Sequence, residues 1–282
     1  SASHIFPYLV PSIRRLEFSV MAVDRMQKQR FEKKYRITED VASNVREFVS
    51  AHLGLDEHGA GRPSYSYAVH SLYLDSDDLK LYWETINGNK NRFKLRLRFY
   101  STHPDAPVFF EIKRRVNNCI MKQRGGVRQD SVPLLLKGHL PQIEHLVSKG
   151  PNQLVALQTF CDLANTMHAK PKVHIFYMRE AYVSDDDQSR VTIDRKVYGE
   201  ANMDYSIKTE MQHPSLSFAN HVILELKFTN RFPDWFRELV RVFGVMQCGA
   251  AKYCESVQAI GFEKLGATHA VLEEGVRFSR SW

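Results

Sequence analysis

Several segments of the chain alternate between charged and hydrophobic residues. The clearest runs from Arg92 to Tyr100, where Arg or Lys fills every second position up to Arg98 and Phe or Leu fills the positions between. Successive side chains of a β-strand face opposite sides, so this segment predicts a strand with four cations on one face and an apolar opposite face. Like charges on one face repel, and a solvated sheet normally interleaves neutral or acidic residues.

Other predicted strands repeat this division into a charged and an apolar face. They are expected at Arg30–Thr38, Val108–Val116, Ile120–Arg128, Arg190–Asp194 and His221–Phe228. Their charged faces hold Glu32, Lys34 and Arg36; Glu111, Lys113 and Arg115; Lys122 and Arg124; Arg190, Thr192 and Asp194; and Glu225 and Lys227. Further strands are expected at Tyr67–Leu74, Lys172–Val183 and roughly Gly199–Thr209.

An exposed sheet face packed on helices would explain any one of these strands. Together they favour an α+β fold, a closed antiparallel β-barrel with helices covering the apolar outer faces and a charged lumen. A lumen so rich in cations is stable only if a polyanion, a metal or water compensates its charge. The strand pattern therefore points to an anionic ligand inside the barrel.

Helices are expected around the barrel. Apolar spacing predicts helices over 39–52 and 233–243, and residues 79–86 read as a short helix or an extended arm. Prolines at 133, 141 and 151 suit helix starts, which predicts a helical insertion around 131–169. We expect one tunnel domain over 30–262, preceded by an N-terminal arm or leader at 1–29 and followed by a tail at 263–282.

Composition and charge narrow the function. The 282 residues include 43% hydrophobic residues, enough for a large core, and the formal net charge is +7. The basic residues lie on inward strand faces rather than on a helix-borne patch, which argues against nucleic acid. Phosphate-binding glycine loops and protein-kinase motifs are missing from the sequence. The four cysteines form no C-x-x-C pair, which disfavours structural zinc and fits a reducing cytoplasm.

Short motifs along the chain resemble the VTC domain. They are R-x-E-x-K-Y at Arg30, S-L-Y-L-D at Ser71, Y-x-E-x-x-x-G-x-x-x-R-x-K-x-R-x-R-x-Y at Tyr82, E-I-K-R-R at Glu111, V-T-I-D at Val191, L-E-L-K at Leu224 and A-K-Y-C at Ala251. That domain is the catalytic part of the vacuolar transporter chaperone polyphosphate polymerase, has bacterial relatives and belongs to the triphosphate tunnel metalloenzymes. The resemblance implies transfer of the γ-phosphoryl group of ATP onto a growing polyphosphate chain, with Mn²⁺ or Mg²⁺.

The resemblance also implies site residues. We expect catalytic roles for Lys34, Arg96, Arg98, Lys113 and Lys122, and phosphate binding by Arg92, Lys94, Arg179, Arg190, Lys227 and Lys252. Glu225 is expected to hold the metal. Glu32 and Glu111 are candidates for a second metal contact, with salt bridges to Lys34 and Lys113 as the alternative. The sequence departs from the eukaryotic polymerases at Gly249, where they carry a second lysine.

Three functions stay open at this point. Beside the polymerase, the same groups would serve an inorganic or nucleoside triphosphatase, or a non-catalytic module that binds polyphosphate or inositol phosphates. The expected partners are ATP and inorganic polyphosphate, without nucleic acid and without a transmembrane segment. The expected location is the cytoplasm. A second option is the cytoplasmic face of a membrane, where the protein would act beside a membrane protein partner.

Overall fold

A closed barrel forms the centre of the molecule. The computed structural model describes residues 30–117 and 119–266, so the predicted arm or leader at 1–29 and most of the predicted tail lie outside the described residues. The described strands are β1 (Arg30–Ile37), β2 (Gly54–Leu55), β3 (Ser66–Asp75), β4 (Asn91–Phe99), β5 (Val108–Val116), β6 (Cys119–Val127), β7 (Lys170–Val183), β8 (Ser189–Ala201), β9 (Ser215–Leu216) and β10 (Val222–Thr229).

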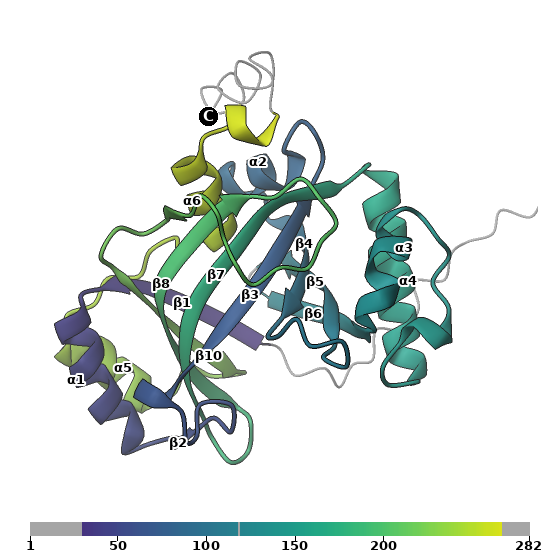
Figure 1. The fold of residues 1–282 in the computed structure, drawn as a ribbon. Helices are drawn as coiled ribbons and strands as arrows, with labels where there is room; N and C mark the ends of the chain where they lie inside the picture. Colours follow the sequence, from purple (N-terminus) through teal and green to yellow (C-terminus); the bar gives the residue numbers. More distant parts are fainter. Residues whose placement is uncertain (1–29, 118, 267–282) are drawn as a thin grey trace, which may run out of the picture.

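Eight of these strands close into a ring, in the order β7-β3-β4-β5-β6-β1-β10-β8, with β8 pairing back onto β7. Neighbouring strands in this ring run antiparallel (Figure 1). The predicted closed antiparallel barrel is therefore confirmed. One seam is thin, because β1 and β6 pair only at Arg30 and Ile120 among the described residues.

Helices cover the outside of the barrel and one of its ends (Figure 1). They are α1 (Glu39–Ser50), α2 (Lys80–Ile86), α3 (Val132–Leu136), α4 (Pro151–Thr166), α5 (Asp234–Val242) and α6 (Lys252–Ile260). α1 and α5 pack on the apolar faces of β1, β8 and β10. α3 and α4 pack on β4, β5 and β6, where Leu95 and Leu97 are fully buried. The predicted division into charged inner and apolar outer faces thus holds on these strands.

The barrel interior itself has two parts. Toward one end, apolar side chains on the inner faces of β3 and β7, such as Ile175, pack with Val257 and Ile260 of α6. α6 approaches β8 closely, since a Cβ added at Gly199 would lie 2.6 Å from the Cβ of Ser256. The sequence pattern does not predict this apolar packing at one end of the barrel. The apolar packing confines the charged space to the remainder of the barrel.

Two element predictions differ from the structure. No separate strand covers Gly199–Thr209, because β8 runs unbroken to Ala201 and a loop follows. Pairing between β7 and β8 is irregular near Lys196, whose φ is 52°, so the inward positions change from even to odd numbers and the alternation breaks. The segment 131–169 is helical only in part, with turns and 3-10 helix between α3 and α4.

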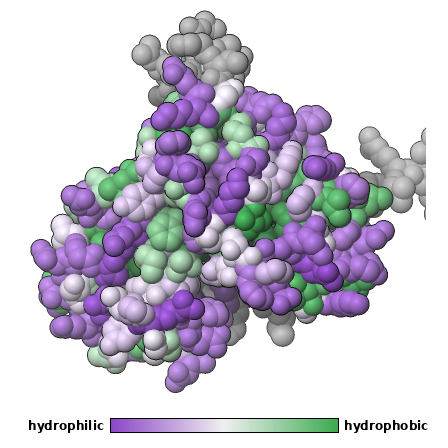
Figure 2. Space-filling view, viewed as in Figure 1, coloured by the Kyte–Doolittle hydropathy of each residue, from purple (hydrophilic) through white to green (hydrophobic). Residues whose placement is uncertain are grey.

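The outer surface is mostly hydrophilic. In Figure 2 hydrophobic residues appear as patches within a mostly hydrophilic face. Exposed large hydrophobic residues of the segment 131–169 include Leu140, Val147 and Val155. No helix within the described ranges has both the length and the apolar character needed to cross a membrane.

Candidate active site

A narrow cavity inside the barrel gathers most of the predicted site residues. Its volume is about 80 Å³, and we call it the tunnel cavity. It is lined from β1, β3, β4, β5, β7, β10 and the start of α6 by Lys34, Tyr73, Lys94, Arg96, Arg98, Lys113, Tyr177, Arg179, Glu225, Lys227, Ala251, Lys252 and Tyr253. Eight of these side chains are cationic and one is a carboxylate.

Glu225 lies at the centre of the charged residues. Its Oε2 lies 2.8 Å from Nζ of Lys227, and its Oε1 lies 3.0 Å from Nζ of Lys252 and 3.3 Å from Nζ of Lys34. Arg179 lies 3.6 Å from Oε2. Burial alone would raise the pKa of Glu225, but the four surrounding cations outweigh burial and hold the pKa well below its usual range. Glu225 is therefore ionised at neutral pH.

Asp194 of β8 supports the same group of cations. It is fully buried and accepts two hydrogen bonds from Arg179, each 2.7 Å long, in the bidentate geometry that fixes a guanidinium. Nζ of Lys252 lies 2.7 Å from its second oxygen. Burial would raise the pKa of Asp194, but Arg179 and Lys252 lower it. Asp194 thereby fixes the position of two cations at the cavity wall.

Glu32 joins β1 to β5. Nζ of Lys113 lies 2.9 Å from Glu32 Oε2, and Nζ of Lys34 lies 3.1 Å from Oε1. Burial would raise the pKa of Glu32, but Lys113 and Lys34 lower it to below its usual range. The salt bridge expected between Glu32 and Lys34 is present.

Glu111 compensates a different part of the wall. It is fully buried and pairs with Arg96, at 2.6 Å from Nη2, and with Lys122, at 2.5 Å. The prediction of a salt bridge between Glu111 and Lys113 is wrong. Arg96 lies directly opposite Glu111 in the β4–β5 register, and Lys113 pairs with Glu32 instead. Lys122 lies at the margin, with 41% of its side chain exposed.

Two cavity cations have no carboxylate partner among the described residues. Arg98, only 6% exposed, donates to the hydroxyl groups of Tyr177 (2.8 Å) and Ser71 (3.3 Å). Lys94 has no hydrogen bond or ion pair within residues 30–117 and 119–266, and burial lowers its pKa. Counting Lys122, nine basic side chains face four carboxylates, an excess of five. Burial lowers the pKa of Lys122 to about 7, so the net positive charge around the cavity is below five at neutral pH.

The remaining predicted residues lie away from the cavity. Arg92 donates to the backbone carbonyl of Asn89 on the approach to β4. Arg190 is held by Asp56, whose Oδ2 lies 2.5 Å from its Nη2. Neither side chain lines the cavity in this structure. Their predicted contacts with phosphate stay predictions.

The sequence as a whole matches a family model. The model of the VTC domain covers residues 29–260. The chain belongs to the VTC domain family. No curated protein matches the sequence. Among solved structures, this VTC domain resembles a proposed adenylate cyclase from Bacillus halodurans, with a TM-score of 0.45 and 14% identity over 79% of this chain and 94% of that chain.

The charge pattern of the sequence does not indicate several polar groups of this site. Tyr73, Tyr177 and Ser71 place hydroxyl groups against Arg96 and Arg98, but they are uncharged, so the charge pattern did not single them out. Burial would raise the pKa of Tyr73, but Arg96, Arg98 and Lys94 outweigh it and lower the pKa to about 8. Asp194 shares a predicted face with Arg190, which was the available signal for its inward position.

The carboxylates of the VTC domain fit a divalent cation only together with a phosphate ligand. Within residues 30–117 and 119–266, no three His, Cys, Asp or Glu side chains gather to hold a metal ion. Glu32 and Glu225 share Lys34 as a counter-ion, so both carboxylates lie within one side chain's reach. Mg²⁺ takes hard oxygen ligands, commonly one or two carboxylates plus substrate phosphates. The donor set is therefore compatible with a divalent cation held by carboxylate and phosphate oxygens together.

Proposed function

We propose that this protein is a metal-dependent polyphosphate polymerase that transfers the γ-phosphoryl group of ATP onto a polyphosphate chain. The excess of five basic side chains over carboxylates around a narrow cavity, lined from six strands and one helix, carries the proposal. Such an excess is costly to bury alone and is compensated by a ligand with several negative charges in a row. A triphosphate or longer phosphate chain has that charge and a width of one phosphate group.

Each group of side chains has a distinct role in the proposed reaction. Arg98 and Lys94, which have no carboxylate partner among the described residues, are the first to bind phosphate oxygens. Arg96, fixed by Glu111 and by the Tyr73 hydroxyl at 3.1 Å, orients the chain for in-line attack. Arg179 and Lys252, fixed by Asp194, neutralise charge on the transferring group. Phosphoryl transfer needs mainly this positioning and neutralisation.

The metal adds charge neutralisation of the phosphate oxygens when it is bound. Glu225 would hold it, with Glu32 as the second contact of the same wall. Glu111, already paired with Arg96 and Lys122 on the β4–β5–β6 side, is the weakest of the three predicted metal ligands.

Incubation with ATP and Mn²⁺ tests the proposal. We expect release of ADP together with phosphate chains longer than the substrate, seen on a polyphosphate gel, and no release when EDTA is added. Orthophosphate without longer chains would assign the protein as a triphosphatase. Tight binding of tripolyphosphate without turnover under Mn²⁺ or Mg²⁺ would assign it as a binding module.

A further inference from the structure

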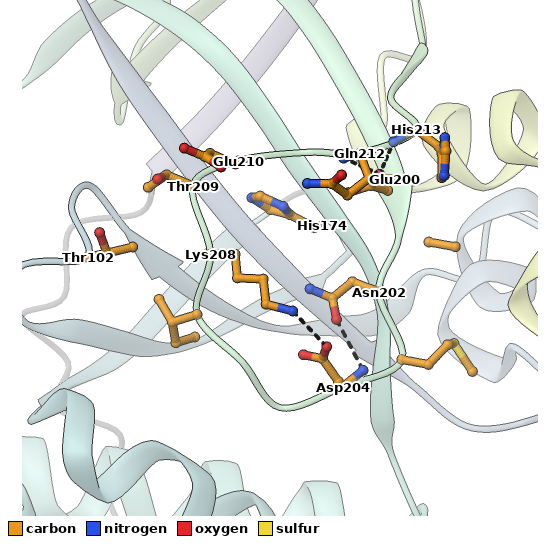
Figure 3. Close-up of a pocket in the computed structure, with 13 residues that line it drawn as sticks. Thr102, His174, Glu200, Asn202, Asp204, Lys208, Thr209, Glu210, Gln212 and His213 are labelled. Atoms are coloured by element: carbon orange, nitrogen blue, oxygen red, sulfur yellow. Dashed lines mark hydrogen bonds and ion pairs between the residues drawn. The ribbon is translucent and has the colours of Figure 1, made fainter.

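A second, larger cavity lies on the outside of the barrel. Its volume is about 680 Å³, within the range of small-molecule sites, and the loop that follows β8 arches over it. We call it the outer cavity. Its walls come from β7, the end of β8, this loop and the segment after β4, and they include His174, Glu200, Asn202, Asp204, Lys208 and Glu210. Figure 3 shows His174 in the middle of the labelled side chains.

The charge of the outer cavity is opposite to that of the tunnel cavity. Lys208 is paired with Asp204 at 3.1 Å. Glu200 accepts backbone hydrogen bonds from Gln212 and His213 through Oε1 and has no cationic partner among the described residues. Glu210 likewise has none within the described ranges. In a chain with a net charge of +7, this space therefore holds two uncompensated carboxylates. A phosphate compound would be repelled here.

A buried imidazole supplies the second observation. His174 is 2% exposed, and its Nε2 lies 3.1 Å from Nδ1 of the equally buried His70. Among the described residues, the hydrogen bond of the His174 ring is the one from Nε2 to His70, and the residue lines the outer cavity. Burial lowers the pKa of His174 to about 3 and that of His70 to about 4, so both rings are neutral. When His174 donates from Nε2, its Nδ1 is left as a hydrogen-bond acceptor of a residue that lines the cavity.

We propose that the outer cavity binds an aliphatic polyamine, with Glu200 and Glu210 as counter-charges and Nδ1 of His174 as a hydrogen-bond acceptor. The apolar side chains of Met203 and Ile207 on the same wall would contact the methylene groups between the ammonium groups. A divalent metal fits less well, because within residues 30–117 and 119–266 no three ligating side chains gather. Glu200 lies directly opposite His174 in the β7–β8 register, so the two groups that recognise the amine are held by one sheet.

Isothermal titration of the full chain with spermidine tests the site. The buffer contains no nucleotide and no divalent metal, so the result does not depend on the proposed polymerase activity. We expect saturable binding that becomes at least about tenfold weaker in the double variant Glu200→Gln/Glu210→Gln, because two charge-assisted contacts are lost. The matched control Glu144→Gln/Glu238→Gln removes two exposed glutamates elsewhere and should leave binding unchanged.

A second variant tests the imidazole. His174→Phe keeps an aromatic ring against Phe99, now 5.7 Å from the His174 ring, but removes the acceptor, and it should weaken binding several-fold while thermal melting still shows a folded protein. Absence of saturable binding to the wild-type chain would overturn the proposal. So would equal weakening in the control variant, or undiminished binding after both glutamates are replaced. Binding of uncharged adenosine in preference to spermidine would show that the ligand class is wrong.

Discussion

At the scale of single residues, the two central arginines of β4 differ in what their loss would expose. Arg96 neutralises the fully buried Glu111, whereas Arg98 contacts only hydroxyl groups. Loss of Arg96 would leave Glu111 with Lys122 alone, a lysine whose side chain is 41% exposed and whose pKa burial lowers to about 7. Removing one partner of a buried ion pair costs roughly 3–5 kcal/mol. The same shortening at Arg98 leaves hydroxyl groups that water can satisfy.

We therefore expect Arg98→Ala to abolish transfer from ATP while the melting temperature changes by only a few degrees. Arg96→Ala should abolish transfer and also lower the melting temperature clearly.

Leu95→Asp, on the opposite face of the same strand, should unfold the barrel, because Leu95 is fully buried under the outer helices. Circular dichroism melts beside an ATP turnover assay distinguish these outcomes. A folded Leu95→Asp variant would contradict the assigned strand faces.

Glu225 is the residue on which metal dependence is expected to rest. Glu225→Gln keeps the shape of the side chain but removes its charge, so the Mn²⁺ concentration needed for half-maximal turnover should rise and the maximal rate should fall sharply. Nucleotide binding should persist through Arg98 and Lys94. If Glu225 serves only as a counter-charge for Lys227 and Lys252, the metal titration would stay unchanged and anion binding would tighten. An unchanged titration would remove Glu225 from the metal site.

At the scale of elements, the contact between β8 and α6 determines where Lys252 lies. Lys252 is the first residue of α6, and Gly199 allows the helix to approach the strand. We expect Gly199→Ala to cost about 1–3 kcal/mol through overpacking against Ser256 and to weaken tripolyphosphate binding as Lys252 moves. Gly249→Ala is the matched control, because nothing lies within 4 Å of an added Cβ there. Chemical denaturation and calorimetric titration measure both effects, and equal losses in the two variants would contradict this role.

The elements that could be predicted from the sequence are those in which the spacing of apolar residues stays regular from end to end. In β4 the alternation has no interruption, so both its boundaries and its inward face follow from the pattern. In β8 the irregularity near Lys196 changes the inward positions from even to odd numbers in mid-strand. Strict alternation of inward and outward residues therefore predicts two strands where the structure has one. The prolines of 131–169 marked helix starts correctly at Pro133 and Pro151, but Pro141 begins no α-helix.

The candidate site was predictable where charge identified it. Lys34, Arg96 and Lys113 lie on the cavity wall because strand alternation fixes their face. The pairing of each carboxylate with its cations could not be predicted, since it depends on the register between strands. The hydroxyl groups around Arg98 were missed because Tyr and Ser on an inner face look the same in sequence whether they bind a guanidinium or pack in a core.

At the scale of the whole molecule, the cations around the tunnel cavity repel one another, and a bound anion relieves this repulsion. Ligands that bind only the folded state stabilise it in proportion to the logarithm of their concentration. We expect tripolyphosphate, without metal, to raise the melting temperature, with a smaller rise in 0.5 M NaCl because salt screens the cations. Orthophosphate at equal total charge should raise it less. Equal shifts from the two anions would show that the cavity does not recognise a chain.

The thin seam between β1 and β6 changes how a long polymer can reach the interior. Within the described ranges, backbone pairing joins β1 and β6 at one position, so this side of the ring is held by fewer backbone hydrogen bonds than the others. The Glu32–Lys113 bridge joins β1 and β5 across it, and phosphate oxygens can compete for that lysine. If the proposed function holds and phosphate binding separates β1 from β6, a long phosphate chain would enter the tunnel cavity from the side, and circular polyphosphates would bind as readily as linear ones.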